Sequence, residues 1–311
     1  YRFALDPVAE TTADLHSYGF RQQRCVQDAI ERCFQTLGKQ KSPVWVLEGD
    51  IKGCFDNISH DWIMNNIPMD KVILHQFLKS GYMETGTLFP TEMGTPQGGT
   101  ISTTICNMVL DGLEPILKEH FKPKWVDGKN FYSAVNYTRY ADDFIITGKD
   151  PAVLENEVKP IVRQFLEERG LTLSEEKTLI THIEDGFDFL GCNVRKYSGK
   201  LLIKPAKSSV KSFLRKIRGI IRQNKTATQQ DLIARFSAML TRRFSMLSGD
   251  GRSADIITKV PSGLCENTFT VSIHEIGLLH GSGNETTVPQ AISLWNTHPI
   301  PKSSDSPESV M

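Results

Sequence analysis

The sequence predicts an α/β protein, α+β in a finer classification, in which helices back an antiparallel sheet. Short β-rich runs alternate with helical patterns in the order β-α-β hairpin-α-β, which is the first observation behind this prediction. The second is the tight turn Ala141-Asp142-Asp143, which joins two such runs, 137–140 and 144–147, into an expected hairpin. The chain has 311 residues, of which 39% are hydrophobic and 23% charged, enough for two domains and a substantial core.

The first half of the chain supplies one strand and several helices. Within residues 1–40, a turn followed by a helix around 27–37 is expected. The β-rich run 43–51 contains Val44-Trp45-Val46-Leu47 and predicts a strand that ends at Asp50. Three further helices are predicted, the last of them apolar and preceded by the Gly/Pro/Thr segment 94–100. These helices are expected at 61–66, 71–81 and 101–118.

The second half supplies the remaining strands. A helix is predicted at 151–170, with Gly170 as its C-terminal cap. The strands that follow are expected at 177–182, 187–197 and 200–204. The turn Ser198-Gly199 joins the last two of them.

A cluster of cations follows these strands, although the formal net charge of the chain is zero. Residues 195–225 hold eleven Lys or Arg and no Asp or Glu. At about 100° per residue, five of these cations fall within about 80° of each other on a helix, and an apolar stripe occupies another side. The five are Lys207, Lys211, Arg215, Arg218 and Arg222. Such a row suits nucleic-acid phosphates, and its plainer alternative is a solvated helix face.

Several bulk features narrow the class of protein. The six cysteines lie singly and far apart, so neither a zinc site nor a disulfide framework is expected. Free cysteines are typical of a reducing compartment, so a cytoplasmic location is expected. No run of about 18 apolar residues and no signal peptide occurs, so no membrane partner is expected. Because the first residue is Tyr1 rather than Met, the chain is expected to be a fragment.

Three carboxylates are the main candidates for chemistry. Asp50 ends a predicted strand, and Asp142 and Asp143 lie at the tip of a predicted hairpin. If these strands are neighbours, the carboxylates converge and repel each other unless hard divalent cations bind between them. Two Mg²⁺ ions held about 3.5–4 Å apart activate a 3′-hydroxyl and stabilise a leaving pyrophosphate. The plainer alternative is a solvated Asp-Asp turn without catalytic role.

Six motifs follow one another over about residues 1–235. They are Ser17-Tyr18-Gly19-Phe20-Arg21, Asp50-Ile51-Lys52-Gly53-Cys54-Phe55-Asp56-Asn57-Ile58, Thr95-Pro96-Gln97-Gly98-Gly99, Tyr140-Ala141-Asp142-Asp143, Leu173-Ser174-Glu175-Glu176-Lys177-Thr178 and Gly186-Phe187-Asp188-Phe189-Leu190-Gly191. In order and spacing they resemble the motifs of reverse transcriptases of the group II intron type. The resemblance implies that Asp50 and Asp142 coordinate two Mg²⁺ ions, for which Mn²⁺ could substitute. The backbone carbonyl of Ile51 would help, and Asp143 would add a ligand or local negative charge.

The resemblance also implies roles in nucleotide binding. Phe55 would clash with a 2′-hydroxyl and so select deoxynucleotides; its alternative is a core aromatic. Gln97 and Gly98 would line the nucleotide pocket, where glycine permits close backbone approach. Arg21 would pair with the triphosphate. Lys177 would donate a proton to the pyrophosphate, against the alternative of a solvated lysine where a strand begins.

The implied architecture is a right-hand polymerase. Residues 1–40 would form partial fingers, 41–205 the palm, and 206–240 the start of a truncated helical thumb that carries the basic helix. The family's first fingers segment and its maturase domain are expected to be missing. Residues 241–311 are expected to form an atypical tail without a compact core, because polar residues dominate and only five Lys or Arg follow Arg235.

The implied function is RNA-directed DNA polymerase activity of an intron retroelement. Its partners would be dNTPs, an RNA template with a DNA primer, and an intron RNA that the intact relative helps to splice. Three alternatives were weighed. A non-catalytic RNA-binding maturase is disfavoured by the three carboxylates, and a polymerase of a diversity-generating or defence system by the intron-type sequence outside the core motifs. A truncated, inactive relic stays open.

Overall fold

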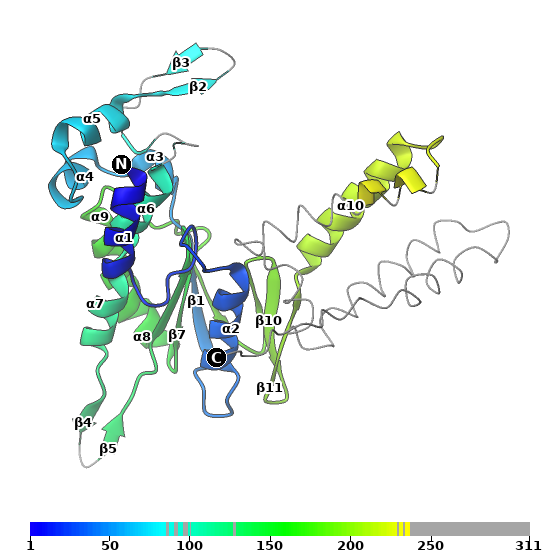
Figure 1. The fold of residues 1–311 in the computed structure, drawn as a ribbon. Helices are drawn as coiled ribbons and strands as arrows, with labels where there is room; N and C mark the ends of the chain where they lie inside the picture. Colours follow the sequence, from blue (N-terminus) through cyan, green and yellow to red (C-terminus); the bar gives the residue numbers. More distant parts are fainter. Residues whose placement is uncertain are drawn as a thin grey trace, which may run out of the picture. The chain divides into compact units, whose positions relative to one another are not determined.

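The computed structural model describes residues 1–84, 87–89, 93–95, 99, 101–126, 129–228, 230–232 and 234–236. Its centre is a four-stranded sheet in the order β6-β7-β1-β8, in which every pairing is antiparallel (Figure 1). The strands are β1 (Trp45–Gly49), β6 (Asn136–Tyr140), β7 (Asp143–Gly148) and β8 (Leu179–His182). This sheet and its helices confirm the predicted fold class.

Side chains alternate between the two faces of this sheet, and each face has its own apolar core. On one face, Leu47 and Ile146 belong to the larger core, which also takes in buried residues of helices α6, α7 and α9. On the other face, Val46 and Ile145 pack with residues of helix α2 and of a second sheet. The sheet is therefore enclosed on both faces, and functional groups are left to its edges and strand ends.

Nine further helical elements surround the sheet in the described part of the chain before the basic helix. They are α1 (Arg2–Thr12), α2 (Val26–Leu37), α3 (Cys54–Asn57), α4 (His60–Asn66), α5 (Lys71–Lys79), α6 (Ser102–Leu110), α7 (Leu113–His120), α8 (Pro151–Val153) and α9 (Lys159–Glu167). A π-helical turn, Leu154–Val158, joins the last two. Serine and aspartate start two of the helices, since Ser59 caps α4 and Asp70 caps α5.

The described residues also form three smaller sheets, all with antiparallel pairing. Two of them are hairpins, β2 (Tyr82–Glu84) with β3 (Thr87–Phe89) and β4 (Lys124–Val126) with β5 (Lys129–Phe131). The third is the sheet β11-β10-β9. Its strands are β9 (Phe187–Phe189), β10 (Cys192–Tyr197) and β11 (Lys200–Pro205).

The predicted turn at the start of residues 1–40 is wrong, because the helix α1 occupies Arg2–Thr12. Pro7 lies inside this helix and lacks the N–H that a helix interior uses, which made the segment read as irregular. Tertiary contacts stabilise it nevertheless: Leu5 is buried in the larger core, and Thr104 Oγ1 on α6 donates a hydrogen bond to Asp6 Oδ1 at 2.7 Å.

The single helix predicted at 101–118 is wrong, because two helices occupy this segment and break at Asp111-Gly112. Gly112 has a φ of 103°, which glycine adopts without strain. The break frees Asp111 for an ion pair with Arg139, and Asp14 accepts hydrogen bonds from the backbone N–H groups of Gly112 and Glu114 at the start of α7. Apolar periodicity continued through this break and concealed it.

The single strand predicted at 187–197 is also wrong. Leu190 and Gly191 both have positive φ, 50° and 78°, so the chain reverses there and β9 pairs with β10. The predicted helix 151–170 is present with a π-helical turn before Pro160, which has no N–H to donate, and Gly170 ends it with a φ of 75°.

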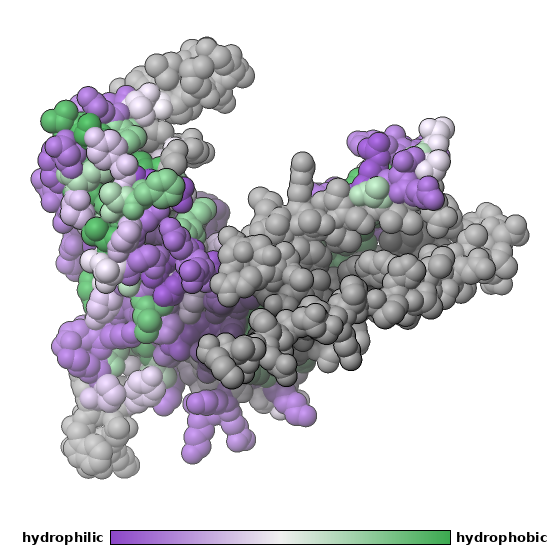
Figure 2. All heavy atoms as spheres, in the orientation of Figure 1, coloured by the Kyte–Doolittle hydropathy of each residue, from purple (hydrophilic) through white to green (hydrophobic). Residues whose placement is uncertain are grey.

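The basic helix is confirmed as α10, Lys207–Gln223, with all five predicted cations exposed and Ile217 buried on the apolar side. Figure 2 shows hydrophilic residues gathered over its far end. The described residues include no helix of the length and apolar character needed to cross a membrane. The predicted tail, 241–311, lies outside the described residues.

Candidate active site

The three predicted carboxylates lie at one end of the central sheet. Gly49, the last residue of β1, pairs with Phe144 of β7, so the next residue, Asp50, lies level with Asp143. Tyr140 pairs with Asp143 across the β6–β7 hairpin, which places Asp142 in the turn between them. A Cβ at Gly49 would overlap the Phe144 ring, so this close packing of β1 on β7 requires glycine.

Hydrogen bonds from Arg139 hold the turn that carries Asp142. Ala141 has a φ of 56°, an uncommon conformation for a residue with a side chain. Arg139 Nη1 donates hydrogen bonds to the Ala141 carbonyl at 3.1 Å and to Asn107 Oδ1 at 3.0 Å. Its Nη2 pairs with Asp111 Oδ1 at 2.5 Å. Since Arg139 is 1% exposed, this network is buried and fixes the turn.

The loop that joins α1 to α2 packs directly against the same turn. Tyr18 N–H donates to the Arg139 carbonyl at 2.9 Å, and Asn107 Nδ2 donates to the Gly19 carbonyl at 2.9 Å. A Cβ at Gly19 would overlap the backbone of Ala141, so the loop can approach this closely only with glycine. The β6–β7 turn is therefore supported by α6 and by this loop together.

The carboxylates influence each other electrostatically. Asp143 is exposed at the hairpin tip, yet the surrounding protein displaces part of its water, and this desolvation raises the pKa of its carboxyl. The negative charges of Asp142 and Asp50 raise the pKa further. Carboxylate oxygens in such a negative field are the donors that hard divalent cations prefer.

The donor chemistry thus fits a divalent metal ion. Among the described residues, however, no group of three or more His, Cys, Asp or Glu side chains is gathered closely enough to hold one. Asp50 is paired instead with Lys177, whose Nζ lies 3.2 Å from Asp50 Oδ2. The assignment of Asp50, Asp142, Asp143 and the carbonyl of Ile51 as metal ligands therefore stays a prediction.

Lys177 reaches the site from the segment before β8. Ser174 N–H donates to the Asp50 carbonyl at 2.8 Å, and Lys177 N–H donates to the Ser174 carbonyl at 3.2 Å. These bonds tie residues 174–177 to the end of β1 and bring the ammonium group to the carboxylate. The Lys177 side chain is 69% exposed, so it stays accessible to a substrate.

Phe55 lies on α3, five residues after Asp50, and is half-buried. Thr95 N–H donates to the Phe55 carbonyl at 2.7 Å, so the segment that leads to the predicted nucleotide pocket runs along α3. Gly94 lies against the backbone of Asp56, where a Cβ would overlap it. Gln97 and Gly98 themselves lie outside the described residues, and their predicted role stays a prediction.

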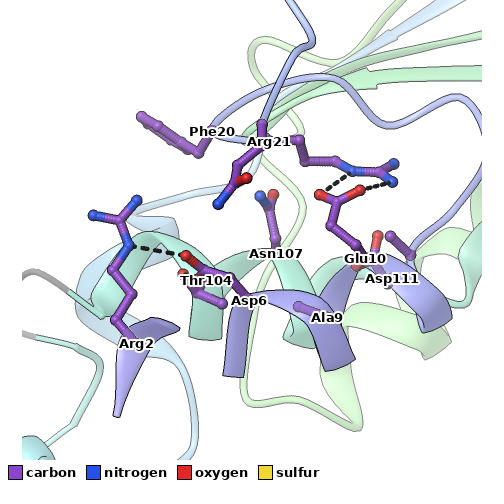
Figure 3. Close-up of a pocket in the computed structure, with 11 residues that line it drawn as sticks. Arg2, Asp6, Ala9, Glu10, Phe20, Arg21, Thr104, Asn107 and Asp111 are labelled. Atoms are coloured by element: carbon purple, nitrogen blue, oxygen red, sulfur yellow. Dashed lines mark hydrogen bonds and ion pairs between the residues drawn. The ribbon is translucent and has the colours of Figure 1, made fainter. Parts of the chain in front are cut away.

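The side chain of Arg21 is bonded within the protein and is not free to bind a phosphate. Its guanidinium pairs with Glu10 through Nε at 3.0 Å and Nη2 at 2.6 Å, and Nη1 donates to the carbonyls of Asp14 and Ser17. The side chain is 5% exposed. Glu10 and Arg21 line a small pocket between α1, α6 and the loop that joins α1 to α2 (Figure 3). In this structure Arg21 holds in place the loop that packs against the β6–β7 turn, and its triphosphate role stays a prediction.

The supporting network is what inspection of the sequence missed. Asp14, Asn107, Asp111 and Arg139 come from three separate segments, since Asn107 and Asp111 both belong to α6 and its end, and only Arg139 adjoins a motif. The one available signal was a charged residue in the middle of a β-rich run, since charged residues are rarely fully buried unless paired.

Comparison with known proteins agrees with the motifs. Residues 3–194, more than half of the 311 residues, match the family described as reverse transcriptase (RNA-dependent DNA polymerase). The chain is 28% identical over 331 residues to the group II intron-encoded protein LtrA of Lactococcus lactis subsp. cremoris, covering 85% of this chain and 54% of that protein. It is 30% identical over 222 residues to protein YkfC of Escherichia coli K12, covering 60% and 57%.

The chain therefore spans about half the length of these curated relatives. Among solved structures it is similar to telomerase from Candida tropicalis in complex with the TWJ fragment of telomeric RNA, at 15% identity and a TM-score of 0.47. That similarity covers 96% of this chain and 56% of the other. The family assignment rests on the sequence matches: the chain belongs to the reverse transcriptase family, and its relatives confirm the group II intron type.

Proposed function

We propose that this chain is the catalytic core of an RNA-directed DNA polymerase that adds dNTPs to a primer 3′-hydroxyl. One observation carries the proposal: within the region that matches the family, the end of β1 and the β6–β7 turn bring Asp50, Asp142 and Asp143 to one end of the sheet. Two-metal nucleotidyl transfer uses carboxylates in this arrangement.

Reverse transcriptases use divalent metal ions, and we propose Mg²⁺ here, with Mn²⁺ as a substitute. Asp50, Asp142 and the Ile51 carbonyl would hold the ions, with Asp143 beside them. When bound, the ions would lower the pKa of the attacking hydroxyl and stabilise the charge of the leaving pyrophosphate.

The chain's own residues would perform the remaining steps. Lys177, which already contacts Asp50, would place its ammonium proton near the leaving pyrophosphate. Phe55 would exclude a 2′-hydroxyl. Arg21 would contact the triphosphate only after its guanidinium leaves Glu10, since both of the paired nitrogens are engaged there.

The template–primer duplex would lie along α10. Its five exposed cations form one row on the helix, and cations spaced along a helix match the phosphates of a nucleic-acid backbone. One curated relative is named as a group II intron-encoded protein, so we propose that the intact protein also binds an intron RNA and assists its splicing. A cytoplasmic location completes the proposal.

Primer extension on poly(rA) with an oligo(dT) primer tests this function. The proposal expects dTTP-dependent elongation in Mg²⁺ that stops when EDTA is added. Duplex binding without elongation at any Mg²⁺ or Mn²⁺ concentration would instead identify an RNA-binding protein that has lost its activity.

A further inference from the structure

Phe20 has two properties that its sequence motif does not explain. The residue is 54% exposed, although phenylalanine is normally buried. Its backbone has a φ of 59°, which is strained for a bulky side chain. Strain of this kind persists only where the surrounding structure imposes it, and it gathers at functional sites.

The residues on both sides of Phe20 impose this conformation. The Gly19 carbonyl accepts a hydrogen bond from the buried Asn107 Nδ2. Arg21 is fastened to Glu10 and to two backbone carbonyls. In Figure 3 the Phe20 ring and the Arg21 guanidinium point away from the loop in opposite directions. With its neighbours fixed, the Phe20 ring has little freedom to move.

The ring of Phe20 meets that of Phe55. Their centroids lie 6.2 Å apart and their planes are inclined by 80°, an edge-to-face contact. Phe55 packs against the larger core and is held at its backbone by Thr95, but it is only half-buried, so part of its ring is open to a contact from another segment. Phe20 makes that contact from the loop that packs against the β6–β7 turn.

We propose that Phe20 is a positioning residue for sugar selection: it presses against Phe55 and keeps that ring where it excludes a 2′-hydroxyl. The inference rests on the proposed polymerase function and deepens it. Its action passes through Phe55, so Phe20 need not touch the nucleotide. The loop stays rigid through two sets of hydrogen bonds that do not involve Glu10. They are the bond from Asn107 to the Gly19 carbonyl and those from Arg21 Nη1 to the Asp14 and Ser17 carbonyls. This rigidity contributes to the choice between deoxynucleotides and ribonucleotides.

The test compares kcat/KM for dATP and ATP in single-nucleotide incorporation on an RNA template with a DNA primer. Phe20→Ala keeps the Cβ, so the energetic cost of the positive φ stays the same. It should reduce the ratio of kcat/KM for dATP to that for ATP about threefold to tenfold, which corresponds to about 0.7 to 1.4 kcal/mol. Phe20→Tyr retains the ring and should stay close to the parent ratio. Phe34→Ala is the matched control, because Phe34 on α2 is also 54% exposed.

Phe55→Ala and the double variant separate the outcomes. Phe55→Ala should relax discrimination, and adding Phe20→Ala should change the ratio no further, because Phe20 acts through Phe55. An unchanged ratio in Phe20→Ala, beside a relaxed one in Phe55→Ala, would overturn the inference and leave the polymerase function standing. So would additive effects in the double variant. A parent chain that incorporates neither nucleotide would overturn the proposed function, and this inference with it.

Discussion

Arg139 connects more of the candidate site than any single carboxylate does. It contacts Asn107, Asp111 and the Ala141 carbonyl from a fully buried position. A planar guanidinium can serve three acceptors in fixed directions, whereas an ammonium group cannot. The orientation of Asp142 should therefore depend on Arg139, although Arg139 does not touch a substrate.

We expect Arg139→Lys to lower the extension rate by about tenfold to a hundredfold, because small misplacements of catalytic groups have effects of that size. Arg169→Lys is the matched control. Arg169 also donates to two buried carbonyls, those of Val109 and Phe165, but does not contact the catalytic turn. Urea unfolding of both variants measures their stability, and equal rate losses at equal stability losses would show that Arg139 has no special role.

Asp14 gives a prediction about pH. Burial raises the pKa of its carboxyl to about 6, and nearby Asp111 raises it further while backbone N–H groups oppose the shift. Because the folded state holds this proton more tightly than the unfolded chain, stability should fall as the pH rises from about 4 to about 6. The decrease from this one group is about 3 kcal/mol at most.

Asp14→Asn should flatten this pH dependence, since the amide does not titrate. Its single oxygen can replace only one of the two carboxylate oxygens that accept from Gly112 and Glu114, so the variant should also be less stable at every pH. Urea unfolding at pH 4, 5, 6 and 7 measures the slope. A variant with the same slope as the parent chain would show that the proton is bound elsewhere.

Residues that stand in motifs can be singled out from the sequence, whereas residues outside motifs cannot. Asp50, Asp142 and Lys177 stand in motifs, and the structure places the three in one region. Asp111 and Asn107 stand in an apolar helical pattern that gave no reason to single them out. Their role arises because α6 packs close to β6 in the folded chain. This tertiary contact leaves no periodic pattern in the local sequence.

Among the helices and strands, α10 gives the clearest functional prediction, the binding of a nucleic-acid backbone. Its cations are exposed and lie apart from the buried Ile217, so they are available to phosphates. Neutralising Lys211, Arg215 and Arg218 to Gln should weaken binding of an RNA–DNA duplex about equally for all sequences. It should also reduce the slope of log K against log salt by about 0.7–0.9 per lost phosphate contact.

The control for this experiment is Lys216→Gln. Lys216 is exposed on the same helix but lies on the opposite side from Lys207 at about 100° per residue. Fluorescence anisotropy at several salt concentrations measures both variants. If the triple variant keeps the parent slope, the row of cations is a solvated helix face.

Elements were predicted well where one period governs a whole segment, and less well where a break interrupts it. The strands at the centre of the sheet and the helix α10 have consistent patterns, and the structure confirms them. The breaks at Gly112 and at Leu190-Gly191 depend on positive φ angles. A glycine permits such an angle without requiring it, so its position alone did not reveal the two breaks.

For the whole molecule, the boundaries of fingers, palm, thumb and tail stay predictions. The tail prediction is testable by comparing the full chain with a version that ends at residue 240. If residues 241–311 add no core, the two should unfold at the same urea concentration and with the same m-value, because m scales with the surface exposed on unfolding. A larger m-value in the full chain would show that the tail forms a packed domain.

We propose that Asp142, at the β6–β7 turn, is part of a polymerase site. The test is single-turnover primer extension on poly(rA)/oligo(dT), with the duplex bound before dTTP and Mg²⁺ are added. The parent chain should extend the primer, and Asp142→Asn should bind the duplex equally but extend it at a rate lower by about two orders of magnitude or more, since charge stabilisation at the reacting centre is lost. Equal extension by the two chains would show that Asp142 takes no part in the reaction.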